Sequence, residues 1–266
     1  MTTNGGRVEA VLYVYHEDPS MCASRVRLLR AVNPGVYLYG IFGGEPERFD
    51  DFAEVNGLLD DAWCCGVGTG KWRWMNMDKV IGLWYEARGR HMPWDVIFEH
   101  QADLLVAAPI REYLERVPRQ DQILFYEMPR SYSELLYSHW PWVVAGLTDL
   151  KDFMTWLHDR FGADARFCGG NILFTVCTRR YMHEYQSFIA DIPGLMEYRA
   201  PSVALALGYE MVPFELPPEH RASVSFSKIP LEPAQVVAQV THPHGARMFH
   251  RVNAPLEPHD LPLSSR

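Results

Sequence analysis

The stretch from Val96 to Val106 reads VIFEHQADLLV, and it is the most informative part of this chain for the fold. It is apolar at both ends, as a short buried strand would be. Its middle carries the polar residues Glu99, His100, Gln101 and Asp103. Ligands of open α/β sheets bind at the carboxyl ends of the strands, so polar side chains at that end indicate a binding site. A solvated edge strand with an ordinary turn is the alternative interpretation.

Strand and helix patterns alternate on both sides of this stretch. Apolar, β-rich runs occur at 8–15, 36–42, 62–67 and 172–176. Apolar residues recur at helical spacing from Ser24 onward, across 75–90 and across 150–161. A further helix is expected at 201–208, with Pro201 in its first turn and Gly208 just past its end. This alternation predicts an α/β fold.

The sequence predicts one large domain. Its 266 residues are 48% hydrophobic, which is enough for a sizeable core, and we find no internal repeat or low-complexity linker. From Pro213 onward the chain becomes rich in proline, and we expect irregular structure there. We therefore place the domain at 1–252 and an irregular C-terminal tail at 253–266.

Composition and charge argue against several classes of protein. The chain has 25 basic and 33 acidic residues and no block of Lys and Arg, which argues against general nucleic-acid binding. No apolar run reaches the roughly 20 residues of a membrane span, and we see no signal peptide, so we expect a cytoplasmic protein. The five cysteines lack zinc-site spacing, and we expect most of them to be reduced and buried.

The glycine cluster GVGTGK at 66–71 does not match a nucleotide-binding loop. A Walker loop would need glycine in place of Cys65 and Ser or Thr in place of Trp72, and GxGxxG would need glycine in place of Lys71. We expect a flexible turn. The tryptophans that follow, Trp72, Trp74, Trp84 and Trp94, are expected to pack in the core, although one of them could stack on a base or sugar.

From about Val8 to about Val252 the chain resembles GT-A-type glycosyltransferases. That family has a DxD metal motif between a strand and a short second strand, and Gln101-Ala102-Asp103 is similar to it with Gln in place of the first Asp. The preceding helix carries an Asn, here Asn76, as in the family pattern. Three later segments match by order: GGNILFTV at 169–176, GLMEYRAPSVALALGYEMVP at 194–213 and THPH at 241–244.

The resemblance implies a GT-A-like fold with a mostly parallel central sheet flanked by helices. Its nucleotide-sugar half would cover about 8–110 and its acceptor half about 120–252. Residues implied to border the donor nucleotide are Tyr15, His16, Gly43, Asn76, Lys79 and Gln101.

The resemblance also implies a metal site and a catalytic base. Asp103 and His242 would hold Mn²⁺ or Mg²⁺ against the diphosphate, and Arg247 and Arg251 could neutralise its charge. Glu197 would be the general base of an inverting enzyme. His242 and Glu197 each have an ordinary alternative interpretation. His242 would be an exposed histidine of the tail, and Glu197 would be an acid that the helix dipole stabilises at the N-terminus of its helix.

The predicted function is transfer of a sugar, by a hexosyltransferase-like enzyme, from a nucleoside-diphosphate sugar to a small-molecule, glycan or protein acceptor. Gln101 is a poorer metal ligand than Asp, so a metal-independent variant stays open. A sugar-1-phosphate nucleotidyltransferase is a second hypothesis, but HEDPSMCASR at 16–25 lacks the glycine-rich loop that it needs. A catalytically silent nucleotide- or sugar-binding protein of the same fold is a third.

Overall fold

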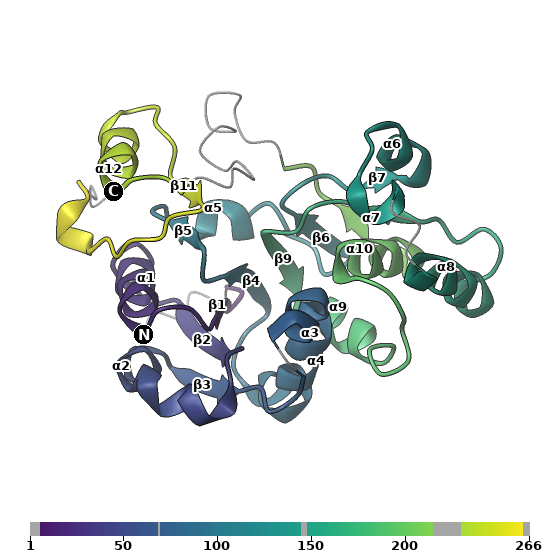
Figure 1. Ribbon diagram of the computed structural model, residues 1–266, viewed down its shortest axis with the longest axis horizontal. Coiled ribbons are helices and arrows are strands. Elements are labelled where there is room, and N and C mark those ends of the chain that lie inside the picture. Colours follow the sequence, from purple (N-terminus) through teal and green to yellow (C-terminus); the bar gives the residue numbers. More distant parts are fainter. Residues whose placement is uncertain (1–5, 69, 145–147, 215–229, 263–266) are drawn as a thin grey trace. The chain divides into compact units, whose positions relative to one another are not determined.

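The computed structural model describes residues 6–68, 70–144, 148–214 and 230–262, and Figure 1 shows their helices and strands. The chain divides into two compact units. Unit 1 comprises Met1–Gly66, Ile97–Leu114 and Glu215–Arg266, and unit 2 comprises Val67–Val96 and Glu115–Phe214. Segments of the two units therefore alternate along the sequence.

Unit 1 is built on parallel strands. In it β1 (Glu9–Tyr15) pairs with β2 (Tyr37–Phe42), and β2 pairs with β3 (Asp61–Cys64), both in parallel. On the other side of β1 lies β4 (Val96–Gln101). Tyr15 lies opposite Phe42 in the β1–β2 register, so these two strands end at the same edge of the sheet.

Helix α1 (Pro19–Val32) follows β1 and begins earlier than the apolar spacing from Ser24 predicts. The Asp18 carboxylate accepts hydrogen bonds from the backbone N–H groups of Ser20 at 2.9 Å and Met21 at 3.1 Å. Pro19 occupies the first turn, where its missing N–H costs nothing. The cap and the proline together set the start of the helix.

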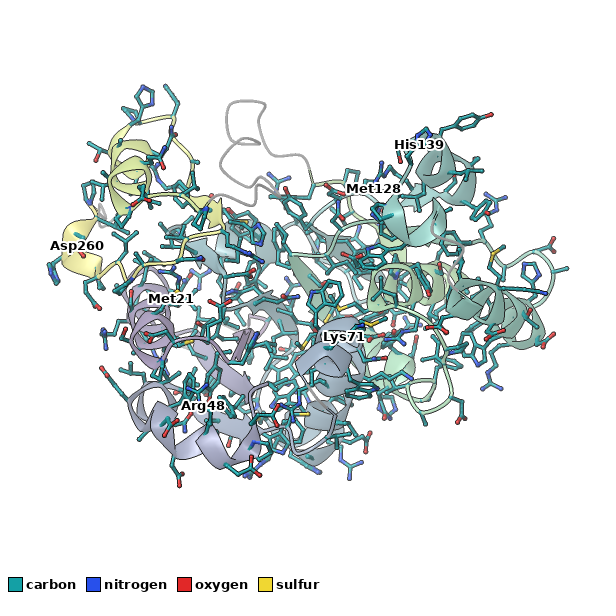
Figure 2. All side chains as sticks on the ribbon, in the orientation of Figure 1. Met21, Arg48, Lys71, Met128, His139 and Asp260 are labelled. Carbon is teal, nitrogen blue, oxygen red and sulfur yellow. The ribbon has the colours of Figure 1, made fainter. Side chains whose placement is uncertain are left out.

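The other short elements of unit 1 are η1 (Pro46–Phe52), α2 (Ala53–Leu58), β5 (Leu104–Val106), α5 (Arg111–Leu114), α12 (Pro233–Thr241), β11 (Met248–His250) and η3 (Pro258–Asp260). β11 pairs antiparallel with β5, and Figure 1 shows β11 beside β5. Figure 2 labels Met21 on α1 and Asp260 on η3, which is the last element among the described residues.

The expectation of irregular structure from Pro213 onward is wrong for α12 and β11. Pro233 lies in the first turn of α12, where proline is compatible with a helix. Val236 and Val240, four residues apart, bury one face of α12 against Leu105 and Phe249. Proline content alone therefore hid a short helix with an apolar face.

Unit 2 holds the strands β6 (Gln122–Phe125), β9 (Phe174–Thr178) and β10 (Glu210–Met211), together with the two-stranded pair β7 (Arg130–Ser131) and β8 (Cys168–Gly169). β6 is antiparallel to β9 and parallel to β10. Its helices are α3 (Gly70–Met75), α4 (Met77–Ala87), η2 (Gly89–His91), α6 (Tyr132–Tyr137), α7 (Pro141–Val144), α8 (Thr148–Phe161), α9 (Arg179–Gln186) and α10 (Met196–Ala206).

The expected position of Pro201 in its helix is wrong. α10 begins at Met196, so Pro201 lies inside it, and Gly208 follows the helix with φ of 81° as predicted. A proline at this position cannot donate the usual hydrogen bond to the carbonyl of residue 197, four positions earlier. That carbonyl accepts instead from the backbone N–H of Gly170 at 3.1 Å.

The fold is thus α/β, with a mostly parallel central sheet flanked by helices, as the sequence predicts. Within the described residues, every helix is too short or too polar to cross a lipid bilayer.

Candidate functional site

In unit 1 the candidate site centres on Asp103, in the turn that joins β4 to β5. The pairing of β5 with β11 brings His250 to it: Asp103 Oδ2 lies 3.1 Å from His250 Nε2 and 3.8 Å from Arg251 Nε. Burial alone would raise the pKa of Asp103, but the hydrogen bond from His250 and the charges of His250 and Arg251 lower it below the usual value. Asp103 is therefore a carboxylate at neutral pH.

Helix α1 holds the segment that follows β11. Arg25 is buried, and its Nη2 donates to the carbonyl oxygens of Val252 at 2.8 Å and Ala254 at 3.3 Å. Ser24 Oγ donates to Leu256 O at 2.7 Å and accepts from Leu256 N at 2.8 Å. These contacts fix the backbone immediately after the residues that meet Asp103.

The donor set at Asp103 fits a divalent cation that is shared with a bound ligand. A carboxylate and an imidazole are both common metal ligands. Within the described part of the chain, however, no group of three or more His, Cys, Asp or Glu side chains could hold a metal ion. A cation at Asp103 and His250 would thus need further oxygen ligands, such as those of a diphosphate.

The structure gives His242 different neighbours. It caps the C-terminal end of α12 and is exposed, its Nδ1 accepts from the backbone N–H of His244 at 3.2 Å, and its carbonyl accepts from Arg247 at 3.2 Å. The histidine that the structure brings to Asp103 is His250, which sequence reasoning missed. Its signal in the sequence was weak: one histidine after the two apolar residues Met248 and Phe249.

The residues predicted to border the nucleotide in unit 1 differ in exposure. Tyr15 is fully buried, and its hydroxyl donates to Asn56 Oδ1. His16 is exposed at the end of β1, and a Cβ added to Gly43 would lie 4.0 Å from His16 Nδ1. The structure therefore places His16 beside Gly43 at the edge of the sheet, while Tyr15 is a core residue. Gln101 is half-buried at the end of β4.

Asn76 and Lys79 lie in unit 2, around a buried ion pair. Arg199 Nη2 lies 2.6 Å from Asp78 Oδ1, and Tyr185 donates to Asp78 Oδ2 at 2.5 Å. Asn76 Oδ1 accepts from Arg199 Nη1 at 3.0 Å. The side chain of Lys79 is half-buried, and its pKa is lowered by burial first and by the charge of Arg199 second.

Glu197, the predicted general base, is held in the first turn of α10 by the glycines before β9. Its carbonyl accepts from Gly170, as described above. A Cβ added to Gly169 would come within 3.2 Å of the Glu197 carbonyl oxygen and of Tyr198 Cβ, so glycine permits this close approach. The GGN segment and Pro201 together position Glu197.

The carboxyl group of Glu197 has properties suited to proton transfer. Burial raises its pKa to about 7, with a further increase from the charge of Glu127, while hydrogen bonds from Trp142 and the backbone of Ile172 act in the opposite direction. Its Oε2 is buried and has no hydrogen-bond partner among the described residues. A carboxyl group with a pKa near neutral can take or give a proton at physiological pH.

Glu127 and Asn171 complete this group of polar residues. Asn171 Nδ2 donates to Glu127 Oε2 at 3.0 Å, and Trp140 Nε1 donates to Asn171 Oδ1 at 3.4 Å. Glu127 was missed from the sequence, although it follows the apolar strand β6 by two residues. The rule that drew attention to Asp103, polar residues beyond the carboxyl end of a buried strand, would have found it.

The two units thus offer different chemistry. Unit 1 presents a carboxylate, an imidazole and a guanidinium, which together can bind a cation and an anion. Unit 2 presents a carboxyl group that can exchange a proton, among aromatic and amide side chains.

No family model matches this chain, and no curated protein matches it. It is similar to solved structures of glycosyltransferases. Mouse Xyloside xylosyltransferase 1 in its apo form is 13% identical, with 94% of this chain and 99% of that chain covered and a TM-score of 0.43. The WbbM bifunctional glycosyltransferase is 7% identical, with 97% of this chain and 47% of that chain covered and a TM-score of 0.49. The galactosyltransferase LgtC, in complex with donor and acceptor sugar analogs, is 10% identical, with 94% of this chain and 89% of that chain covered and a TM-score of 0.47. At these identities and TM-scores the likeness carries no argument about the activity of this chain.

Proposed function

We propose that this protein is a glycosyltransferase that moves a sugar from a nucleoside-diphosphate sugar to an acceptor hydroxyl. The observation that carries the proposal is the meeting of Asp103, His250 and Arg251 at the turn after β4. This is where ligands bind in open α/β sheets, and the three groups suit a diphosphate with its counter-ion.

On the donor side each residue has a separate role. Arg251, whose side chain is 49% exposed, offers its guanidinium to the diphosphate. Asp103 and His250 would hold Mn²⁺ or Mg²⁺, with Gln101 beside them. Such a cation, when bound, stabilises the negative charge that develops on the departing diphosphate. His16 and Gly43 would border the nucleotide, and Asn76 and Lys79 keep the nucleotide-binding role that the resemblance implies for them.

On the acceptor side Glu197 would act as general base if configuration inverts. The acceptor oxygen forms a bond to the anomeric carbon as the bond from that carbon to the diphosphate oxygen breaks. The electron pair of the broken bond stays on the nucleoside diphosphate, and the hydroxyl proton passes to Glu197.

A thermal-shift panel of nucleoside diphosphates, with and without Mn²⁺, tests the proposal. A ligand that binds the folded chain raises its melting temperature, and we expect a larger rise with Mn²⁺ present. D103N and H250A should lose the Mn²⁺-dependent part of the rise, while the matched variant H242A should keep it. If no nucleoside diphosphate raises the melting temperature, the proposal is contradicted.

A catalytically silent nucleotide- or sugar-binding protein is the second candidate. Gln101 favours it, because a neutral amide binds a divalent cation less well than a carboxylate does. Release of nucleoside diphosphate from nucleotide sugars separates the two candidates. Turnover that disappears in D103N supports the transferase, and nucleotide binding without turnover supports the silent protein.

A further inference from the structure

Trp74 departs from the expectation that the tryptophans of this region pack in the core. Trp84 and Trp94 are buried, but Trp74 on α3 is 48% exposed. Its ring centroid lies 5.7 Å from that of Trp142 on α7, with the two ring planes 58° apart. An exposed indole tilted against a second one forms an aromatic corner within unit 2.

Trp142 connects the aromatic corner to neighbouring polar side chains. Trp142 hydrogen-bonds to the Glu197 carboxylate, and the charge of Glu127 acts on that carboxylate. Asn171 and Trp140 extend the chain of contacts from Glu127. Met128, the neighbour of Glu127 in sequence, is 48% exposed and is labelled in Figure 2. We call the six residues Trp74, Trp142, Glu197, Glu127, Asn171 and Trp140 the acceptor cluster.

We propose that the acceptor cluster binds a neutral saccharide, whose ring packs against Trp74 and Trp142 and whose hydroxyl groups contact Glu197 and Glu127. This inference rests on the proposed function and names the class of its acceptor. In the transfer step, one of these hydroxyl oxygens bonds to the anomeric carbon of the donor. Its proton passes to Glu197, and the electron pair of the broken bond leaves with the nucleoside diphosphate.

The composition of the cluster favours a sugar ring. Aromatic side chains bury large apolar area and bind the apolar faces of ligands, and a sugar ring offers such a face. Carboxylate and amide oxygens accept hydrogen bonds from hydroxyl groups, and Glu197 Oε2 has no such partner within the described residues. A ring with hydroxyl groups along its edge satisfies both kinds of contact at once.

The same residues disfavour other acceptors. None of the six side chains carries a positive charge and two of them are glutamates, so the cluster itself offers no counter-charge to a phosphate or carboxylate on the acceptor. An acyl chain would cover the carboxylates and leave them without hydrogen bonds, which is costly. A lysine or arginine side chain could pair with the glutamates, but it has no hydroxyl proton for Glu197 to accept.

Saturation-transfer NMR and calorimetry on the full chain, with lactose, maltose and cellobiose as probes, test this inference. Glucose 6-phosphate and glucuronic acid are the anionic counterparts. We expect binding of at least one neutral disaccharide, weaker binding of both anionic sugars, and about a tenfold rise in Kd for W74A. Y137A, which removes a tyrosine that is 84% exposed outside the cluster, is the matched control and should bind normally.

Each other outcome overturns the inference. Tighter binding of the anionic sugars, equal effects of W74A and Y137A, or no binding of any neutral disaccharide would all contradict it. Nucleoside-diphosphate binding is measured on the same samples. If it persists while saccharide binding fails, the acceptor assignment is wrong and the proposed function stands; if both fail, both are wrong.

Discussion

At the scale of single residues, the neighbours of Glu197 change its pKa in opposite directions. Burial is the main reason that the pKa is raised to about 7, and the charge of Glu127 adds to it, while the Trp142 hydrogen bond lowers it. A general base works in its deprotonated form, so turnover should rise as pH increases through about 7. The two neighbours can therefore be tested separately through the acidic limb of the pH profile.

E127Q removes the like charge and should move the acidic limb of kcat to lower pH. W142F removes a hydrogen bond to the carboxylate and should move that limb to higher pH. E134Q, which alters an exposed glutamate that pairs with Ser131, should leave the profile unchanged. The measurement is kcat against pH at saturating substrate. Shifts of E127Q and W142F in the same direction would contradict the assignment of Glu197 as the base.

Sequence reasoning reached Asp103 and Glu197 more readily than their partners. Asp103 follows an apolar strand, and Glu197 lies in a segment that matched by order, so local pattern drew attention to both. His250 meets Asp103 only because β11 pairs with β5, and that pairing joins residues about 145 positions apart. A local pattern contains no information on such a pairing, which is why the THPH segment was the more visible choice.

At the scale of elements, α1 does more than cover the sheet. Ser24 makes two hydrogen bonds with the backbone of Leu256, and Arg27 binds both carboxylate oxygens of Glu257 at 2.8 and 2.6 Å. The helix thus anchors the chain that follows His250 and Arg251. Its apolar spacing was visible in the sequence, but these polar contacts with the C-terminal segment were not.

S24A should loosen this anchor. It leaves the N–H and the carbonyl of Leu256 without their partner in a buried site, and we expect a loss of about 1–3 kcal/mol in the free energy of unfolding. R48A is the control, because it removes the exposed pair with Asp51 and an exposed guanidinium 5.9 Å from the centroid of the Phe52 ring, and it should cost less than about 1 kcal/mol. Urea unfolding followed by circular dichroism measures both. A smaller loss for S24A than for R48A would show that the anchor contributes little.

At the scale of the whole molecule, the sequence predicted the class of fold and most of its elements, because hydrophobic periodicity is local. It did not reveal that Ile97–Leu114 and Glu215–Arg266 join the N-terminal segment in one compact unit. That arrangement depends on contacts between distant segments, such as those of Ser24 with Leu256. It also means that no single cut in the chain separates the two units.

The two units can be compared by removing one buried hydroxyl from each. In unit 2, Y185F removes the hydrogen bond from Tyr185 to Asp78, next to the buried pair with Arg199, and in unit 1, S24A removes the bonds to Leu256. All of these contacts lie within their own units. Since local openings follow cooperative units, Y185F should speed hydrogen exchange in α4 and α10, and S24A should speed it in β11 and α1. Hydrogen-exchange mass spectrometry measures both variants against the wild type. If either substitution instead speeds exchange equally in both units, the chain opens as one cooperative body and the prediction of separate openings is wrong.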